Sequence, residues 1–175
     1  VRFDGLVTAD KLLQLAGTGT TTLAGTLTLA SDLDFTGSAL TLTGTGNTLG
    51  GDFTVANSGV FTTGDAADLT ITGSFSQTGA GGSVVGEDIQ ADTGIAFAGD
   101  LTLKGDTDEP IAFSTDGAVG SDIVLGGDLG NTAGESLVFD AGAGGDITVT
   151  GDVGGLGTGD LEIRNAAVVR FDGLV

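Results

Sequence analysis

The sequence predicts an all-β protein, and within that class a right-handed parallel β-solenoid (β-helix) with about seven coils. Three observations support this fold class. Short segments that alternate apolar and polar residues recur along the whole chain, glycine-rich turns separate them, and the first seven residues return unchanged 168 residues later. A β-sandwich repeat, in which Gly-Asp turns close hairpins, is the alternative.

The returning heptad is the most specific of the three observations. Residues 1–7 and 169–175 both read Val-Arg-Phe-Asp-Gly-Leu-Val. This match predicts that residues 1–168 form one unit of a tandem array and that residues 169–175 begin the next unit. It is also compatible with a non-covalent filament, in which one terminal heptad occupies the place of its twin in a neighbouring copy.

Alternating segments inside this unit are expected to be strands. In Leu40–Gly44 the period of two places leucines on one face and threonines on the other, and glycine ends the run. Residues 10–15 are the only candidate for a helix, and they fit a strand equally well. We expect strands within Thr26–Ala30, Leu40–Gly44, Phe53–Val55, Leu69–Gly73, Ile95–Gly99, Leu101–Gly105, Ile123–Gly127, Leu137–Gly142, Ile147–Gly151, Leu161–Asn165 and Val168–Gly173.

The spacing of similar segments indicates the length of one coil. Leu101, Ile123, Ile147 and Val169 begin such segments at intervals of 22, 24 and 22 residues. A coil of roughly 24 residues with three short strands would place about seven coils in one unit. At about 4.8 Å per coil, one unit would rise by roughly 34 Å.

Gly-Asp steps are expected to form the turns between strands, because glycine allows positive φ and the aspartate side chain can cap the turned backbone. The nine phenylalanines are expected to stack mostly inside the solenoid. The steps occur at residues 51–52, 64–65, 99–100, 105–106, 127–128, 145–146, 151–152 and 159–160.

Composition excludes several classes of protein. Glycine is abundant, at 34 of 175 residues, but there is only one proline and 39% of the residues are hydrophobic, so neither collagen nor a disordered tail fits. The chain has no histidine, cysteine, methionine, tryptophan or tyrosine. Thiolate and imidazole chemistry are therefore absent, and we expect no enzymatic activity.

Charge restricts the partners. Asp and Glu number 24 against 5 Lys and Arg, which gives a net charge of −19. Such a surface repels nucleic acid and anionic membranes, and it attracts cations or keeps a fibre soluble. No apolar run approaches the ~18 residues of a membrane-spanning helix, so we expect no membrane insertion.

Two acidic groups are candidate sites. Asp106, Asp108 and Glu109 lie within four residues in a turn closed by proline, and their oxygens suit calcium; the alternative is a solvated acidic turn. Calcium is the only cofactor that we consider. Asp32 and Asp34 would point to the same side of a strand, as paired carboxylates of a glycosidase can, but an outward polar face explains them better.

Several threonine-rich runs carry a resemblance to a known family. Residues 25–29, 40–44 and 146–151 resemble the repetitive stalks of filamentous-haemagglutinin-like adhesins and of bacterial autotransporter passengers. The resemblance implies secretion, a right-handed parallel β-helix and a long rigid stalk at the cell surface. It transfers no catalytic residue.

The expected function is therefore a structural repeat of a long extracellular bacterial fibre or adhesin stalk, which gives rigid reach and cell-to-cell or surface attachment. Its partners would be copies of itself, in tandem or end to end, and other cells or surfaces contacted through regions outside this chain. The alternatives are a calcium-binding extracellular domain, a β-helix enzyme acting on polysaccharides, and an ice-binding face built from Thr-x-Thr pairs such as Thr41 and Thr43.

Overall fold

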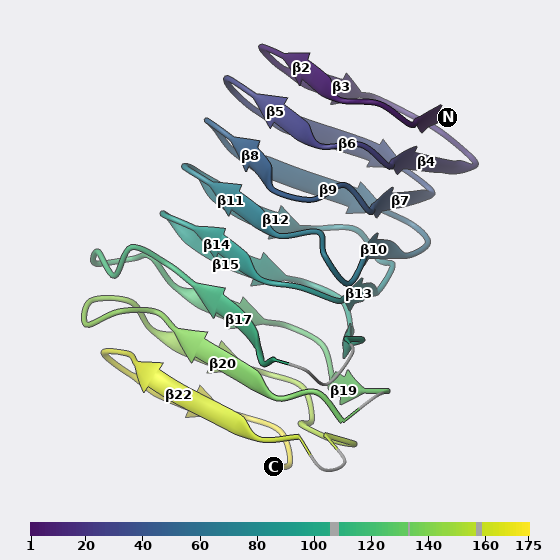
Figure 1. Cartoon of the computed structure of the whole chain (residues 1–175). Coiled ribbons are helices and arrows are strands. Elements are labelled where there is room, and N and C mark those ends of the chain that lie inside the picture. Colours follow the sequence, from purple (N-terminus) through teal and green to yellow (C-terminus); the bar gives the residue numbers. More distant parts are fainter. Residues whose placement is uncertain (106–108, 133, 157–158) are drawn as a thin grey trace.

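The structure is a computed structural model that describes residues 1–105, 109–132, 134–156 and 159–175. In these residues the chain forms strands and turns, without helices. Three parallel sheets run along the molecule, and each strand pairs with strands of the coils above and below it (Figure 1). The predicted β-solenoid is confirmed, and it has about eight turns. The antiparallel hairpins of the alternative β-sandwich do not occur among the described strand pairings.

Sheet A contains the first strand of each coil, and its strands follow the order in which they occur in the chain. An isolated parallel bridge from Leu129 to Val153 adds an eighth position at its end. The seven strands are β1 (Arg2–Phe3), β4 (Thr20–Leu23), β7 (Ala39–Leu42), β10 (Phe61–Thr63), β13 (Ser83–Val85), β16 (Leu101–Leu103) and β19 (Leu129–Asn131).

Sheet B contains the second strand of each coil. Its eight strands are β2 (Val7–Ala9), β5 (Leu27–Leu29), β8 (Asn47–Leu49), β11 (Leu69–Ile71), β14 (Ile89–Ala91), β17 (Ile111–Ser114), β20 (Leu137–Asp140) and β22 (Leu161–Asn165).

Sheet C contains the third strand of each coil. Its eight strands are β3 (Leu12–Gln14), β6 (Leu33–Gly37), β9 (Phe53–Asn57), β12 (Ser74–Gln77), β15 (Gly94–Phe97), β18 (Ile123–Leu125), β21 (Ile147–Val149) and β23 (Val169–Phe171).

The turns between the sheets form three corners, A–B, B–C and C–A, named in chain order. In Figure 1 the chain runs leftward through the nearer strands of sheet B and rightward through the more distant strands of sheet C, while it descends from the N-terminus. This sense of winding is right-handed, as parallel strand crossovers almost always are.

Most strands of three residues direct their first and third residues inward. Leu27 and Leu29 of β5 are buried and Thr28 between them is exposed, and the same pattern holds in β11. Successive side chains of a strand point to opposite faces, so a strand of three residues supplies two residues to the core. Leucine, isoleucine, valine and phenylalanine occupy most of these inward positions.

A column of phenylalanine rings fills the middle of the core. Phe53 packs edge-on against Phe61 and Phe75, with ring centroids 5.7 and 5.3 Å apart, and Phe75 continues to Phe97 at 4.9 Å. The expectation that phenylalanines lie mostly inside is confirmed for seven of nine, whereas Phe3 is exposed and Phe171 half-buried. The buried seven are Phe35, Phe53, Phe61, Phe75, Phe97, Phe113 and Phe139.

All eleven predicted segments contain a strand or part of one, and residues 10–15 hold strand β3 rather than a helix. The coil length of roughly 24 residues is correct only for part of the chain. Leu101 lies in sheet A, whereas Ile123, Ile147 and Val169 lie in sheet C, so the first of the three spacings does not measure a coil. Equivalent residues of sheet B are 20 apart at Val7 and Leu27.

Candidate functional site: acidic corners and coil ends

Aspartates of the Gly-Asp steps connect successive coils at the C–A corner. The Oδ1 atom of Asp100 accepts the backbone N–H of Asp128 at 3.0 Å, and Oδ1 of Asp128 accepts that of Asp152 at 2.9 Å. Asp152 in turn accepts the N–H of Leu174 at 2.8 Å. The sequence predicted caps within each turn; these side chains instead cap the corresponding residue of the next coil.

The B–C corner uses the same device. Oδ1 of Asp32 accepts the N–H of Asp52 at 3.0 Å, and Asp52 accepts the N–H of Ser74 at 2.7 Å. Asp122 and Asp146 repeat it farther along the stack, at 2.9 Å. The recurring aspartates therefore stabilise the stacking of coils, which is a structural role for much of the negative charge.

The candidate pair Asp32 and Asp34 is held by Lys11. Its Nζ lies 3.2 Å from Oδ2 of Asp32 and 2.6 Å from Oδ2 of Asp34. The hydrogen bond from the Asp52 N–H, followed by that from Lys11, lowers the pKa of Asp32, so this carboxylate is ionised rather than poised to donate a proton. The arrangement favours the outward polar face over paired catalytic carboxylates.

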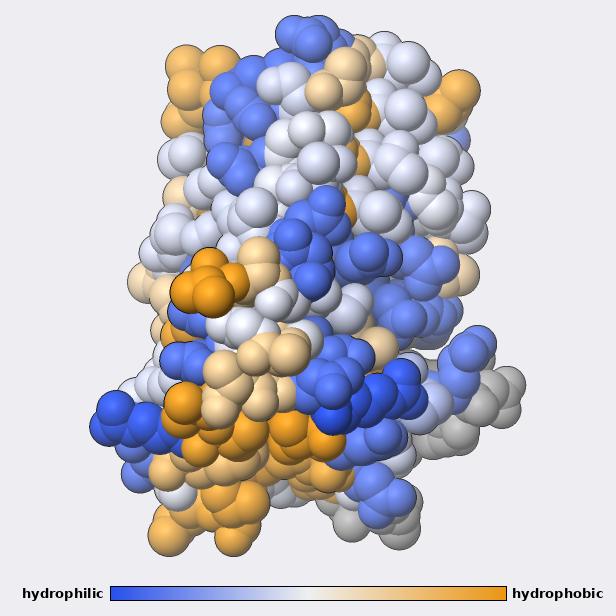
Figure 2. All heavy atoms as spheres, turned by 90° about the vertical axis from the view of Figure 1, so that its left-hand side faces the viewer, coloured by the Kyte–Doolittle hydropathy of each residue, from blue (hydrophilic) through white to orange (hydrophobic). Residues whose placement is uncertain are grey.

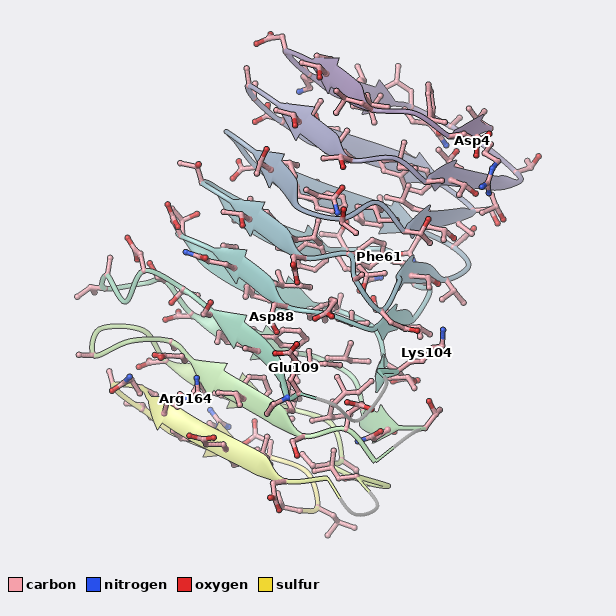
Figure 3. The ribbon with its side chains drawn as sticks, in the orientation of Figure 1. Asp4, Phe61, Asp88, Lys104, Glu109 and Arg164 are labelled. Carbon is pink, nitrogen blue, oxygen red and sulfur yellow. The ribbon has the colours of Figure 1, made fainter. Side chains whose placement is uncertain are left out.

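Acidic side chains gather at the A–B corner (Figure 3). Asp68, Asp88 and Glu109 lie at this corner on successive coils, just before β11, β14 and β17 respectively. Desolvation, followed mainly by the charge of Asp68, raises the pKa of the half-buried Glu87. Desolvation also raises the pKa of Asp88, with smaller contributions from Asp68 and Glu109, although the hydrogen bond from the Ala112 N–H opposes it.

The predicted calcium ligands are only partly described. Asp106 and Asp108 lie outside the described residues, and Glu109 is exposed at the A–B corner (Figure 3). The described part of the chain holds no group of three or more acidic side chains arranged to bind a metal ion. Calcium binding at Asp106, Asp108 and Glu109 therefore stays a prediction.

Glu135 is an acidic residue that the sequence analysis did not single out. It lies at the A–B corner between β19 and β20, and only 1% of its surface is exposed. Its carboxylate packs so closely against Gly105 that a side chain at position 105 would collide with it. Its sequence, Gly-Glu-Ser, resembles an ordinary polar turn, so no local pattern indicates burial.

Threonines form columns on the outer faces of the first coils. In sheet B, Thr8 pairs with Thr28, Thr28 with Thr48 and Thr48 with Thr70. Each three-residue strand of this sheet presents one outward residue, which forms a single column. The second of the Thr-x-Thr pair at residues 41 and 43 lies beyond the end of β7.

The two copies of the heptad have the same local structure. Nε of Arg2 lies 2.5 Å from Oδ1 of Asp4, and Nε of Arg170 lies 2.6 Å from Oδ1 of Asp172. Their partners differ, because β1 begins sheet A and β23 ends sheet C. Identical residues thus form the same strand and turn in two different sheets.

Both ends of the stack expose apolar side chains. At the first coil, Leu13 is 53% exposed and Leu15 is 74% exposed; at the last, Leu174 is 76% exposed. Figure 2 shows hydrophobic side chains gathered at the lower, C-terminal end of the molecule. Unpaired strand edges accompany these side chains, so each end can accept a further coil.

Comparisons with protein-family models, curated proteins and solved structures gave no match to this chain. None of the described elements is a helix long and apolar enough to cross a membrane. The sequence repeat, the solenoid and its two open ends are therefore the features that indicate a function.

Proposed function

We propose that this chain is a structural repeat of a long extracellular bacterial fibre or adhesin stalk, built from tandem copies of the 168-residue unit. The observation that carries the proposal is the recurrence of the heptad at residues 1–7 and 169–175, together with its recurring strand and turn. Its role would be to give reach and to support attachment between cells or to a surface.

The solenoid suits such a role because its core does not grow wider as coils are added. Each coil buries its inward residues against two neighbours, so tandem copies extend one continuous core. A covalent array also covers inward residues that are only partly buried at the two ends of the stack, such as Leu12 and Ile163, and that would otherwise invite aggregation.

Surface charge supports the same proposal. A net charge of −19 repels neighbouring fibres, and the aspartates at the corners carry part of that charge while they bind the next coil. A long acidic fibre therefore stays separate from its neighbours without a loss of cohesion along its axis.

Calcium binding is the second candidate function, favoured by the position of Asp68, Asp88 and Glu109 on successive coils of the A–B corner. A divalent cation bound in the turn that contains Asp106, Asp108 and Glu109 would relieve repulsion among these carboxylates. Isothermal titration with calcium tests it: binding that is lost in the triple variant Asp106→Asn, Asp108→Asn, Glu109→Gln supports the site, and no heat of binding in the wild type excludes it.

Electron microscopy of polypeptides with one, two and three 168-residue units tests the main proposal. We expect straight, unbranched rods of constant width whose length increases by about 37 Å per unit, at about 4.8 Å per coil. Separate globular particles joined by linkers would contradict it. Labelling of intact producing cells with an antibody against the chain tests the surface location, and labelling only after lysis would contradict that part.

A further inference from the structure

We infer that one 168-residue unit advances the solenoid by seven and two-thirds coils, so that successive units in a tandem fibre are rotated by one third of a turn. This inference rests on the proposed tandem fibre. The heptad begins in sheet A at β1 and, 168 residues later, in sheet C at β23. Seven complete coils would have returned it to sheet A.

The second strand of the heptad shows the same displacement. Val7 begins β2 in sheet B, where its N–H donates to the carbonyl of Thr26, one residue before its partner Leu27. Its twin, Val175, follows Leu174, whose carbonyl accepts the N–H of Val153 at 2.7 Å. By the same relation Val175 faces Val153, which is the last position of sheet A.

The side chains of Asp100, Asp128 and Asp152 form a row of hydrogen bonds between coils, the aspartate ladder. This row supports the same placement independently of the strand pairing. At the C–A corner Asp100, Asp128 and Asp152 each accept the N–H of the residue that precedes the next position of sheet A. The last of these donors is Leu174. The ladder thus continues into the second heptad and directs Val175 to sheet A, whereas Val7 lies in sheet B.

The two heptads together describe both sides of the junction. β23 shows the contacts of the heptad with the preceding coil, where Arg170 faces Thr148 and Phe171 faces Val149. β1 shows its contacts with the following coil, where Phe3 faces Leu23.

In a tandem fibre a single strand makes both sets of contacts. The phenylalanine that is 39% exposed at position 3, and half-buried at position 171, is then enclosed between Val149 of one unit and Leu23 of the next. All pairings inside the next unit are kept, because only the sheet that each strand joins has changed.

The geometry of the fibre follows from this junction. Seven and two-thirds coils at about 4.8 Å correspond to a rise of about 37 Å per unit. Every outward feature of a unit, including the acidic A–B corner with Asp88 and Glu109, appears on each of the three sides in turn. The same side returns only after three units, or about 110 Å.

A three-unit polypeptide with Val119→Cys in every unit tests the inference. Val119 is 94% exposed, and the chain has no cysteine of its own, so a thiol-reactive gold label marks one point per unit. Electron tomography should show consecutive labels about 37 Å apart along the axis, at 4.8 Å per coil, and separated by one third of a turn around it.

The matched control deletes residues 153–168 from each unit, so that Asp152 leads directly into the next heptad. Val1 then takes the place of Val153 in sheet A, the unit comprises seven whole coils, and the labels should align on one side at about 34 Å intervals. Aligned labels in the undeleted polypeptide would overturn the one-third rotation but leave the fibre intact. Unconnected particles would overturn the proposed fibre itself.

Discussion

The first coils and the last coils share one core plan but differ in the length of their corners. Equivalent residues in sheet C are 20 apart at Leu33 and Phe53, but 28 apart at Ile95 and Ile123. The strands themselves do not lengthen, since β18 has three residues, like β3. The additional residues lie in the corners, so a solenoid tolerates insertions there as long as the inward pairs stay in register.

The B–C corner shows how the longer coils close. Between β2 and β3 the corner holds only Asp10 and Lys11, whereas between β17 and β18 it holds residues 115–122. Asp116 organises the longer turn, because its Oδ1 accepts the N–H of Ala118 at 2.9 Å and the hydroxyl of Ser121 at 2.8 Å. These bonds lower the pKa of Asp116. Thus the longer corner contains an aspartate that bonds within its own turn, whereas the two-residue corner needs none.

The largest expected effect is in the core that both regions share. Phe75→Ala removes a ring that contacts Phe53, Phe61 and Phe97, and should lower the free energy of unfolding by about 3–5 kcal/mol. Guanidinium denaturation measures it. Phe3→Ala, at an exposed end, should cost less than about 1 kcal/mol, and equal losses at the two sites would contradict a continuous buried column.

A buried amide at the C–A corner of the earlier coils should give the next effect. Nε2 of Gln77 donates to Oδ1 of Asn57 at 2.7 Å and to the carbonyl of Gly81 at 2.7 Å, and Oε1 accepts the N–H of Ala98. Gln77→Ala leaves these buried groups without partners and should cost about 2–3 kcal/mol. Gln90→Ala, at an exposed position, provides the control in the same denaturation experiment. A comparable loss of stability there would show that the buried hydrogen bonds of Gln77 add no stability of their own.

The aspartate ladder of the later coils should contribute less per residue. Asp128→Ala removes the acceptor for the N–H of Asp152 and should lower the free energy of unfolding by about 1 kcal/mol. Asp128→Asn keeps an oxygen at that position and should retain most of the stability. Hydrogen exchange at residue 152 separates the cases: protection lost in both variants would indicate that charge, rather than the hydrogen bond, matters.

The smallest expected effect is a pH dependence of opposite sign in the two acidic corners. The folded-state pKa of Asp88 is raised, so between its unfolded and folded values the folded chain holds more protons, and stability falls as the pH rises. The pKa of Asp32 is lowered, so its contribution is present above its unfolded value and is lost as the pH falls through the folded one.

Urea midpoints near neutral pH test these signs. Asp88→Asn keeps an acceptor for Ala112 and should raise the urea midpoint slightly, whereas Asp32→Asn, which weakens the contact with Lys11, should lower it. Shifts in the same direction for both variants would be inconsistent with the two environments.

Much of the fold could be predicted from the sequence because its signals are local. Alternation in Leu40–Gly44 identifies the inward face, glycine ends the strand, and the repeated heptad indicates a tandem unit. The Gly-Asp steps do form turns, but not for the expected reason: none of their glycines is among those with positive φ, and several of their aspartates cap the next coil rather than their own turn. Several strands, including β12 at Ser74–Gln77, were missed because polar Gln77 occupies an inward position.

The sequence by itself determined that these residues form short strands with defined inward faces, and that the heptad adopts one local structure wherever it occurs. Only the tertiary structure decided which sheet each strand joins, which carboxylate caps which coil, and that Glu135 is buried. The physical reason is that alternation specifies a face but not a sheet, whereas partners 18 to 28 residues away are selected by corner length and by the register of the coil beneath.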